Sequence, residues 1–126
     1  MFDCKPAPPQ RDLSGEWLDR LTGLSNAHIV GEHLVLPGYG EDHPTLEIFS
    51  YGEMNSDNPK VLNGIGLGHL AFEVEDVLTV LKQILKEGGS QIGELVRTEY
   101  PNHATATFVY AKDIEGNIIE LQSWSK

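Results

Sequence analysis

Apolar and polar residues alternate along the C-terminal half of the chain in a pattern that predicts one helix and four strands. Residues 69–74, HLAFEV, alternate with a period of two, as in a strand that buries one face. The next segment places apolar residues at helical spacing, at Val77, Val80, Leu81, Ile84 and Leu85. Asp76 is a suitable N-cap for this helix, and Gly88 and Gly89 supply a C-terminal stop. Residues 92–99, 104–112 and 117–123 predict three more strands, which gives the order β-α-β-β-β.

The N-terminal half carries a shorter set of elements. Residues 14–23 predict a short helix with Ser14 as its N-cap, and residues 28–38 and 45–52 predict two strands. Residues 59–68, PKVLNGIGLG, are glycine-rich and predict a connector, whereas the prolines of residues 1–12 predict an extended arm. The expected organisation is therefore an arm (1–12) and a single α+β domain (13–126). The domain would consist of a truncated module (13–58), a connector (59–68) and a complete module (69–124).

A short repeat links the two halves of the chain. LEIFSY, residues 46–51, and IELQSW, residues 119–124, share the pattern apolar, Glu, apolar, any residue, Ser, aromatic. Alternation along a strand places Glu47, Phe49 and Tyr51 on one face of the first copy and Glu120 on the equivalent face of the second. By the same rule, His69 lies on the mixed face of its own strand.

The position of Glu120 between Ile119 and Leu121 is the main chemical signal in the sequence. An ionised carboxylate within an apolar strand needs either water or a positive partner. If the mixed faces of the strands meet in one concave surface, His69, Glu47 and Glu120 could together bind Zn, Ni, Fe, Mn or Co as a divalent ion. The plainer alternative is that the histidine is solvated or hydrogen-bonded and that the glutamates lie on the surface.

The segments GLGHLAFEVEDV and AKDIEGNIIELQS resemble the second half of vicinal-oxygen-chelate proteins, the superfamily of glyoxalases, bleomycin-resistance proteins and extradiol dioxygenases. Residues 14–38 and TLEIFSY are similar to the latter part of the first half, so the resemblance covers about residues 13–124. It implies paired βαβββ modules whose sheets curl round a cleft, with one His and one Glu from each module as metal ligands. Carried over by motif, these ligands are His69 and Glu120 in the second module and Glu47 in the first.

The first module departs from the family pattern. The stretch between His69 and Glu120 is longer than all of the sequence before Glu47, so the start of this module is expected to be missing, which leaves a helix and two strands. The fourth ligand would be missing with it, and water, a residue of a partner chain or His33 could take its place. An open sheet edge is usually covered or paired, which predicts a homodimer in which another chain, or the arm, completes the sheet.

The resemblance implies a small metal-dependent lyase or isomerase of the glyoxalase or epimerase type. Such an enzyme chelates vicinal oxygens of a small substrate and stabilises an enediolate-like intermediate, and Glu120 would be its catalytic base. The alternative is a metal-free protein of the bleomycin-resistance type that sequesters a ligand, and a third possibility is a remnant with a role in dimeric packing. Candidate substrate-binding residues are Phe49, Tyr51, Tyr110 and Arg97, the last as a partner for an anionic group.

Composition narrows the choice of partners. The net charge of −10 argues against binding to nucleic acid or to an anionic membrane, both of which call for a basic surface. No stretch approaches the roughly 18 consecutive apolar residues of a membrane span. The single cysteine, Cys4, cannot form an internal disulfide, and the N-terminal residues do not resemble a secretory signal, so a cytoplasmic location is expected.

Overall fold

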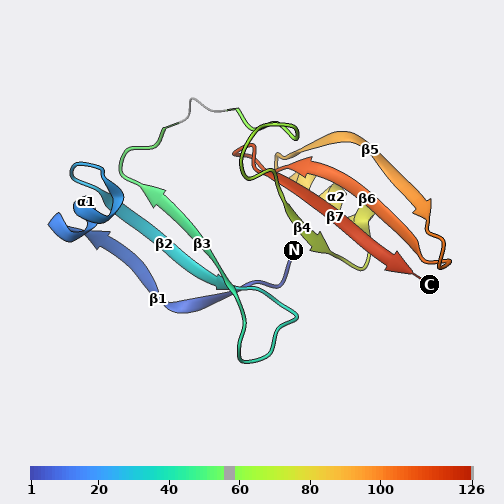
Figure 1. Ribbon diagram of the computed structural model, residues 1–126, viewed down its shortest axis with the longest axis horizontal. Coiled ribbons are helices and arrows are strands. Elements are labelled where there is room, and N and C mark those ends of the chain that lie inside the picture. Colours follow the sequence, from blue (N-terminus) through green and yellow to red (C-terminus); the bar gives the residue numbers. More distant parts are fainter. Residues whose placement is uncertain (56–58, 126) are drawn as a thin grey trace. The chain divides into compact units, whose positions relative to one another are not determined.

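The computed structural model describes residues 1–55 and 59–125, which divide into two compact units (Figure 1). The first unit spans Phe2–Asp57, and the second spans Asn58–Lys126 together with Met1. Each unit contains its own sheet, and the boundary falls next to the predicted connector. Neither helix of the described residues has the length and hydrophobicity that crossing a bilayer requires.

The first unit is a three-stranded antiparallel sheet in the order β1-β2-β3. Its elements are β1 (Lys5–Ser14), α1 (Glu16–Thr22), β2 (His28–Val35) and β3 (Thr45–Tyr51). The sequence predicted two strands here, because it assigned the proline-rich residues to an arm; the structure adds β1 as a third. Pro6, Pro8 and Pro9 are compatible with β1 because it lies at the edge of the sheet, where a strand needs a hydrogen-bonding partner on one side only.

The core of the first unit lies where α1 packs on the sheet. Leu18 of α1 is 1% exposed and forms a buried cluster with Ala27 and Ile29, against which Leu13, Phe49 and Tyr51 also pack. The helix ends at Gly23, which has a left-handed φ of 72°. The prediction of Ser14 as N-cap was wrong, because Gly15 occupies that position and no side chain caps the helix.

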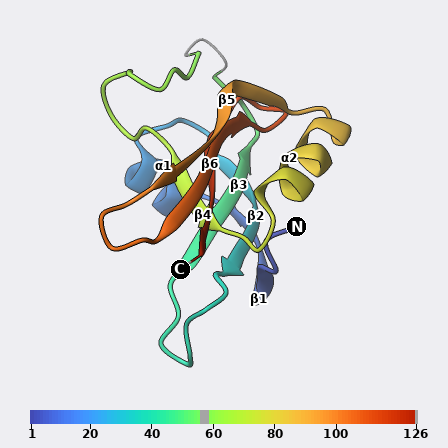
Figure 2. The ribbon, with the colours of Figure 1, turned by 90° about the vertical axis from the view of Figure 1, so that its right-hand side faces the viewer.

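The second unit has the predicted order β-α-β-β-β. Its elements are β4 (Leu70–Glu73), α2 (Val77–Lys86), β5 (Ser90–Glu99), β6 (Thr105–Lys112) and β7 (Ile118–Ser125). The sheet order is β4-β7-β6-β5, in which β4 runs parallel to β7 and the other pairs are antiparallel. The two views of the ribbon show α2 along one face of this sheet (Figures 1 and 2). The mixed α+β fold predicted from the sequence is therefore confirmed.

Helix α2 begins and packs as its sequence indicates. The Asp76 carboxylate accepts hydrogen bonds from the backbone N–H of Thr79 at 3.1 Å and from its hydroxyl at 2.7 Å. These bonds hold the pKa of Asp76 below its usual value, with the hydroxyl as the larger cause. The helix buries Val77, Leu81 and Ile84, and the sheet beneath contributes the buried residues Val109, Ala111 and Leu121.

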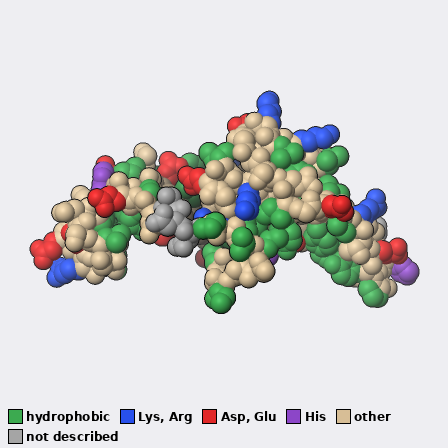
Figure 3. All heavy atoms as spheres, turned by 90° about the horizontal axis from the view of Figure 1, so that it is seen from above, with side chains coloured by type: hydrophobic (Ala, Val, Ile, Leu, Met, Phe, Trp, Pro, Cys, Tyr) green, Lys and Arg blue, Asp and Glu red, His purple; other side chains and the backbone are tan. Residues whose placement is uncertain are grey.

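Charged groups do not form a basic surface on the side shown in Figure 3. The Lys and Arg side chains on that side are scattered between other residues and do not gather into a patch. This distribution agrees with the net charge of −10.

Candidate metal and acid-base site

His69 and Glu120 lie together on the face of the second sheet opposite α2. Glu120 is in the central strand β7, beside Ala71 of β4 and Tyr110 of β6. His69 immediately precedes β4, and its Nε2 atom lies 2.9 Å from Oε2 of Glu120. The side chains are 31% and 16% exposed, so the pair is partly withdrawn from water but still accessible.

This arrangement explains how an acid is tolerated within an apolar strand. The register places Ile119 and Leu121 beside Leu70 and Phe72, towards α2, while Glu120 points to the other face. There the carboxylate has a polar neighbour, because His69 Nε2 is within hydrogen-bonding distance.

Tyr110 completes a small cluster around the pair. Its ring meets the His69 imidazole edge-on, with centroids 5.0 Å apart and planes at 83°. Burial raises the pKa of the Tyr110 hydroxyl, and the charge of Glu120 and a hydrogen bond to its carboxylate raise this pKa further. The hydroxyl is therefore a proton-bearing donor next to Glu120 at neutral pH.

A second histidine–glutamate pair lies in the first unit. His33 of β2 stands directly opposite Glu47 of β3, and its Nε2 atom is 3.2 Å from Oε1 of Glu47. The sequence offered His33 only as a substitute ligand. The register of β2 against β3 is the signal that would have paired it with Glu47, because directly opposed residues in an antiparallel sheet share a face.

The donor atoms of the two pairs suit a divalent transition metal. Imidazole nitrogen and carboxylate oxygen are common ligands of zinc and its neighbours, and a catalytic zinc usually takes about three protein ligands. Within neither unit do three His, Cys, Asp or Glu side chains of the described residues form a metal-binding group. Glu47 belongs to the first unit, while His69 and Glu120 belong to the second, so the three-ligand site stays a prediction.

Of the predicted substrate-binding residues, Tyr110 is the one that the structure places in contact with His69. Phe49 and Tyr51 pack against the core cluster of the first unit. Arg97 lies in β5 beside Thr107, which puts it on the sheet face that carries α2. The structure therefore does not bring Arg97 together with Tyr110 and Glu120.

Further along the strands from the His69–Glu120 pair, the same open face carries three aromatic side chains. Phe108 and Trp124 meet edge-on with ring centroids 5.6 Å apart, and Tyr100 lies 5.3 Å from Trp124. The sequence analysis did not identify Phe108 as a candidate. Its place two residues before Tyr110 in β6 was the available signal, because such residues share a face.

Comparison with known proteins gives the family. Residues 19–121 match the Glyoxalase/Bleomycin resistance protein/Dioxygenase superfamily. The chain is similar to the crystal structure of a glyoxalase family protein from Bacillus cereus, with a TM-score of 0.79 and 24% identity over 98% of this chain and 79% of that one. An integron cassette protein from the mobile metagenome of V. cholerae aligns with 92% of this chain and 77% of its own, at 18% identity and a TM-score of 0.41.

The search of curated proteins gave no match. The family match over residues 19–121 nevertheless covers most of the described chain, and it agrees with the fold and with the predicted resemblance. The chain belongs to the glyoxalase/bleomycin resistance protein/dioxygenase superfamily.

Proposed function

We propose that this protein is a small metal-dependent lyase or isomerase of the glyoxalase or epimerase type. The observation that carries the proposal is the His69–Glu120 pair, an imidazole and a carboxylate 2.9 Å apart on the open face of a sheet. Membership of the superfamily supports it, because the resemblance assigns metal binding to these two residues. The substrate would be a small molecule with a carbonyl group and a neighbouring oxygen.

His69 and Glu120 would hold the divalent cation. An imidazole and a carboxylate fit Zn, Ni, Fe, Mn or Co by donor type. The bound ion would supply Lewis-acid stabilisation of negative charge on the substrate oxygens.

The residues of the chain itself would handle the proton. Glu120 is the proposed general base, and its carboxylate would take a proton from the carbon next to the substrate carbonyl and return it later in the reaction. His69 Nε2 lies within hydrogen-bonding distance of Oε2 of Glu120 and would exchange this contact for the cation. Tyr110, whose raised pKa keeps its hydroxyl protonated, would donate to the Glu120 carboxylate and fix its orientation.

A metal-free ligand-binding protein is the second candidate. The aromatic contacts among Tyr100, Phe108 and Trp124 on the open face favour it, because exposed aromatic rings bind apolar or aromatic ligands without any metal. Under this alternative, His69 and Glu120 would contribute only polar contacts at one end of the ligand.

Metal analysis and an exchange assay together test the proposal. Protein purified without chelator is expected to retain a divalent metal, and to catalyse exchange of the acidic C–H of small 2-hydroxycarbonyl and 2-oxo compounds with deuterium from solvent, followed by NMR. His69→Ala and Glu120→Gln should lose metal, and Glu120→Gln should slow exchange about 100-fold or more, because it removes the base.

The matched control is His103→Ala. His103 also faces a carboxylate, with Nδ1 3.4 Å from Oε1 of Glu99, but both side chains are largely exposed. Loss of metal and exchange in the two site variants, with neither lost in His103→Ala, supports the enzyme. If no variant changes either quantity, the proposal is refuted; absence of metal with unchanged ligand binding in all variants selects the binding protein instead.

A further inference from the structure

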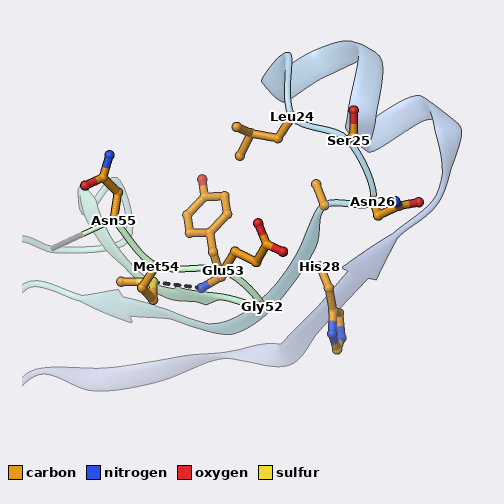
Figure 4. Close-up of a pocket in the computed structure, with 10 residues that line it drawn as sticks. Leu24, Ser25, Asn26, His28, Gly52, Glu53, Met54 and Asn55 are labelled. Atoms are coloured by element: carbon orange, nitrogen blue, oxygen red, sulfur yellow. Dashed lines mark hydrogen bonds between the residues drawn. The ribbon is translucent and has the colours of Figure 1, made fainter.

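A pocket in the first unit lies outside the candidate acid-base site (Figure 4). It has a volume of about 580 Å³, which is within the range of about 300–1,000 Å³ typical of small-molecule sites. Two segments form its walls: the loop that follows α1, and the end of β3 with the residues after it. The lining residues are Leu24, Ser25, Asn26, Ala27, His28, Tyr51, Gly52, Glu53, Met54 and Asn55.

Many backbone N–H groups of these walls already have acceptors within the unit. The Asp19 carboxylate takes two of them, from Asn26 at 2.9 Å and Ala27 at 2.8 Å. The other occupied N–H groups are those of Leu24, Tyr51 and Gly52, which donate to Thr22 Oγ1, Met54 Sδ and the His28 carbonyl. These five N–H groups are therefore not available to an anionic ligand, although backbone donors are the usual means of binding an anion to a loop.

The charge of the pocket points to a cation. Among the described residues that line it, there is no Lys or Arg, and Glu53 supplies a carboxylate. No described residue forms an ion pair with Glu53, and Figure 4 shows its carboxylate directed towards the wall that carries Leu24. His28, also in the lining, is engaged with Asp12, whose Oδ1 lies 2.7 Å from Nε2. The net charge of −10 would further raise the local concentration of cations.

The apolar part of the lining fits an organic ligand better than a bare ion. Leu24 and Met54 are 49% and 65% exposed, so they offer apolar surface to a ligand, and the buried Ala27 also belongs to the lining. The ring of Tyr51 also lines the pocket, and an aromatic face attracts an ammonium group. A carboxylate, an aromatic ring and aliphatic surface are together the groups that recognise an amine with an apolar body.

We propose that this pocket binds an organic ammonium compound. The charged nitrogen lies at Glu53 and the Tyr51 ring, and the apolar body of the ligand covers Leu24 and Met54. The inference is independent of the proposed function, because the pocket shares neither His69 nor Glu120 with the acid-base site.

The test compares two probes of similar size and opposite charge, 2-phenylethylammonium and 3-phenylpropanoate. In an NMR titration of the full chain, the ammonium ion is expected to shift the amide signals of Leu24, Ala27 and Gly52 and to saturate at millimolar concentration. The carboxylate probe should shift none of them. Glu53→Gln should weaken binding of the ammonium ion about tenfold, because a charge-assisted hydrogen bond is lost.

Glu94→Gln is the matched control, since it makes the same change of charge at an exposed residue of β5 in the other unit. Glu94→Gln and His69→Ala are each expected to change the affinity for the ammonium ion by no more than about twofold. The proposal is overturned if the ammonium ion causes no shifts, if the carboxylate probe binds as tightly, or if Glu53→Gln and Glu94→Gln have the same effect.

Discussion

Replacing Leu121 with alanine is expected to destabilise the second unit strongly, and the equivalent change at Ile48 is expected to be mild. The two residues occupy the same position of the repeat, two before the shared serine. Leu121 is 0% exposed, whereas Ile48 is 53% exposed. The difference depends on which sheet face each helix covers. Helix α2 packs on the face of the second sheet that carries Leu121. Helix α1 packs on the face of the first sheet that carries Ile29 and Tyr51, which is the face opposite to that of Ile48.

The magnitude follows from the burial. Leu121→Ala removes three carbon atoms from a fully buried site, which costs about 2.4 kcal/mol of transfer free energy before the cavity is counted. With the cavity, the expected loss in the free energy of unfolding is about 3–4 kcal/mol. Ile48→Ala removes atoms that are already half in water, so about 1 kcal/mol or less is expected.

Urea unfolding followed by tryptophan fluorescence can measure each unit separately, because Trp17 lies in α1 and Trp124 lies in β7. In a Trp17→Phe background the signal comes from the strand that contains Leu121, and in a Trp124→Phe background it comes from the first unit. The reasoning is refuted if Leu121→Ala costs less than about 1 kcal/mol, or if the two substitutions cost the same.

Three further predictions concern the cluster, the first sheet and the assembly. The pKa of Tyr110 is raised above its ordinary value of 10.0 in the folded state. The contribution of Tyr110 to stability is therefore present below pH 10 and is lost as the pH rises through the raised pKa. Glu120→Gln should lower the pKa of Tyr110, as measured by tyrosinate absorbance against a Tyr110→Phe reference. Gly31→Ala should destabilise the first unit by about 1–3 kcal/mol in urea unfolding, because the added Cβ would meet the Ile48 carbonyl oxygen and lie 2.7 Å from Cδ1 of Phe49. Gly40→Ala should leave stability unchanged, because a Cβ added there has no neighbouring atom within 4 Å. Light scattering after size exclusion should give twice the mass of one chain, and a single-chain mass at micromolar concentration would contradict the predicted homodimer.

The sequence predicted the second unit well because local patterns determine it. The alternation around Phe72 and Leu121 gave the sheet faces, and Asp76 marked the start of α2, all without knowledge of distant contacts. Alternation placed His69 and Glu120 on the mixed faces of their strands, and the family resemblance assigned both as metal ligands. Local patterns could not fix their contact, because it joins residues far apart in the chain.

The features that the sequence did not predict depend on contacts between strands, which local patterns do not reveal. Prolines remove backbone donors, so residues 1–12 predicted an arm, but an edge strand does not need a donor at every position. The pairing of His33 with Glu47 depends on the register between β2 and β3, which alternation within one strand cannot supply. Arg97 was predicted to bind an anionic group of the substrate, but its register against Thr107 of β6, which the sequence did not reveal, fixes it on the α2 face.

The prolines of β1 also determine which edge of the first sheet can pair with another strand. A neighbouring strand extends a sheet by bonding to free N–H and C=O groups at its border, and Pro6, Pro8 and Pro9 remove donors from the β1 side. The opposite border, formed by β3, has a proline-free backbone from Thr45 to Tyr51. A second chain that lengthens this sheet would therefore dock along β3, and it would arrive beside Glu47, so recruitment of that chain and access to this carboxylate would be linked.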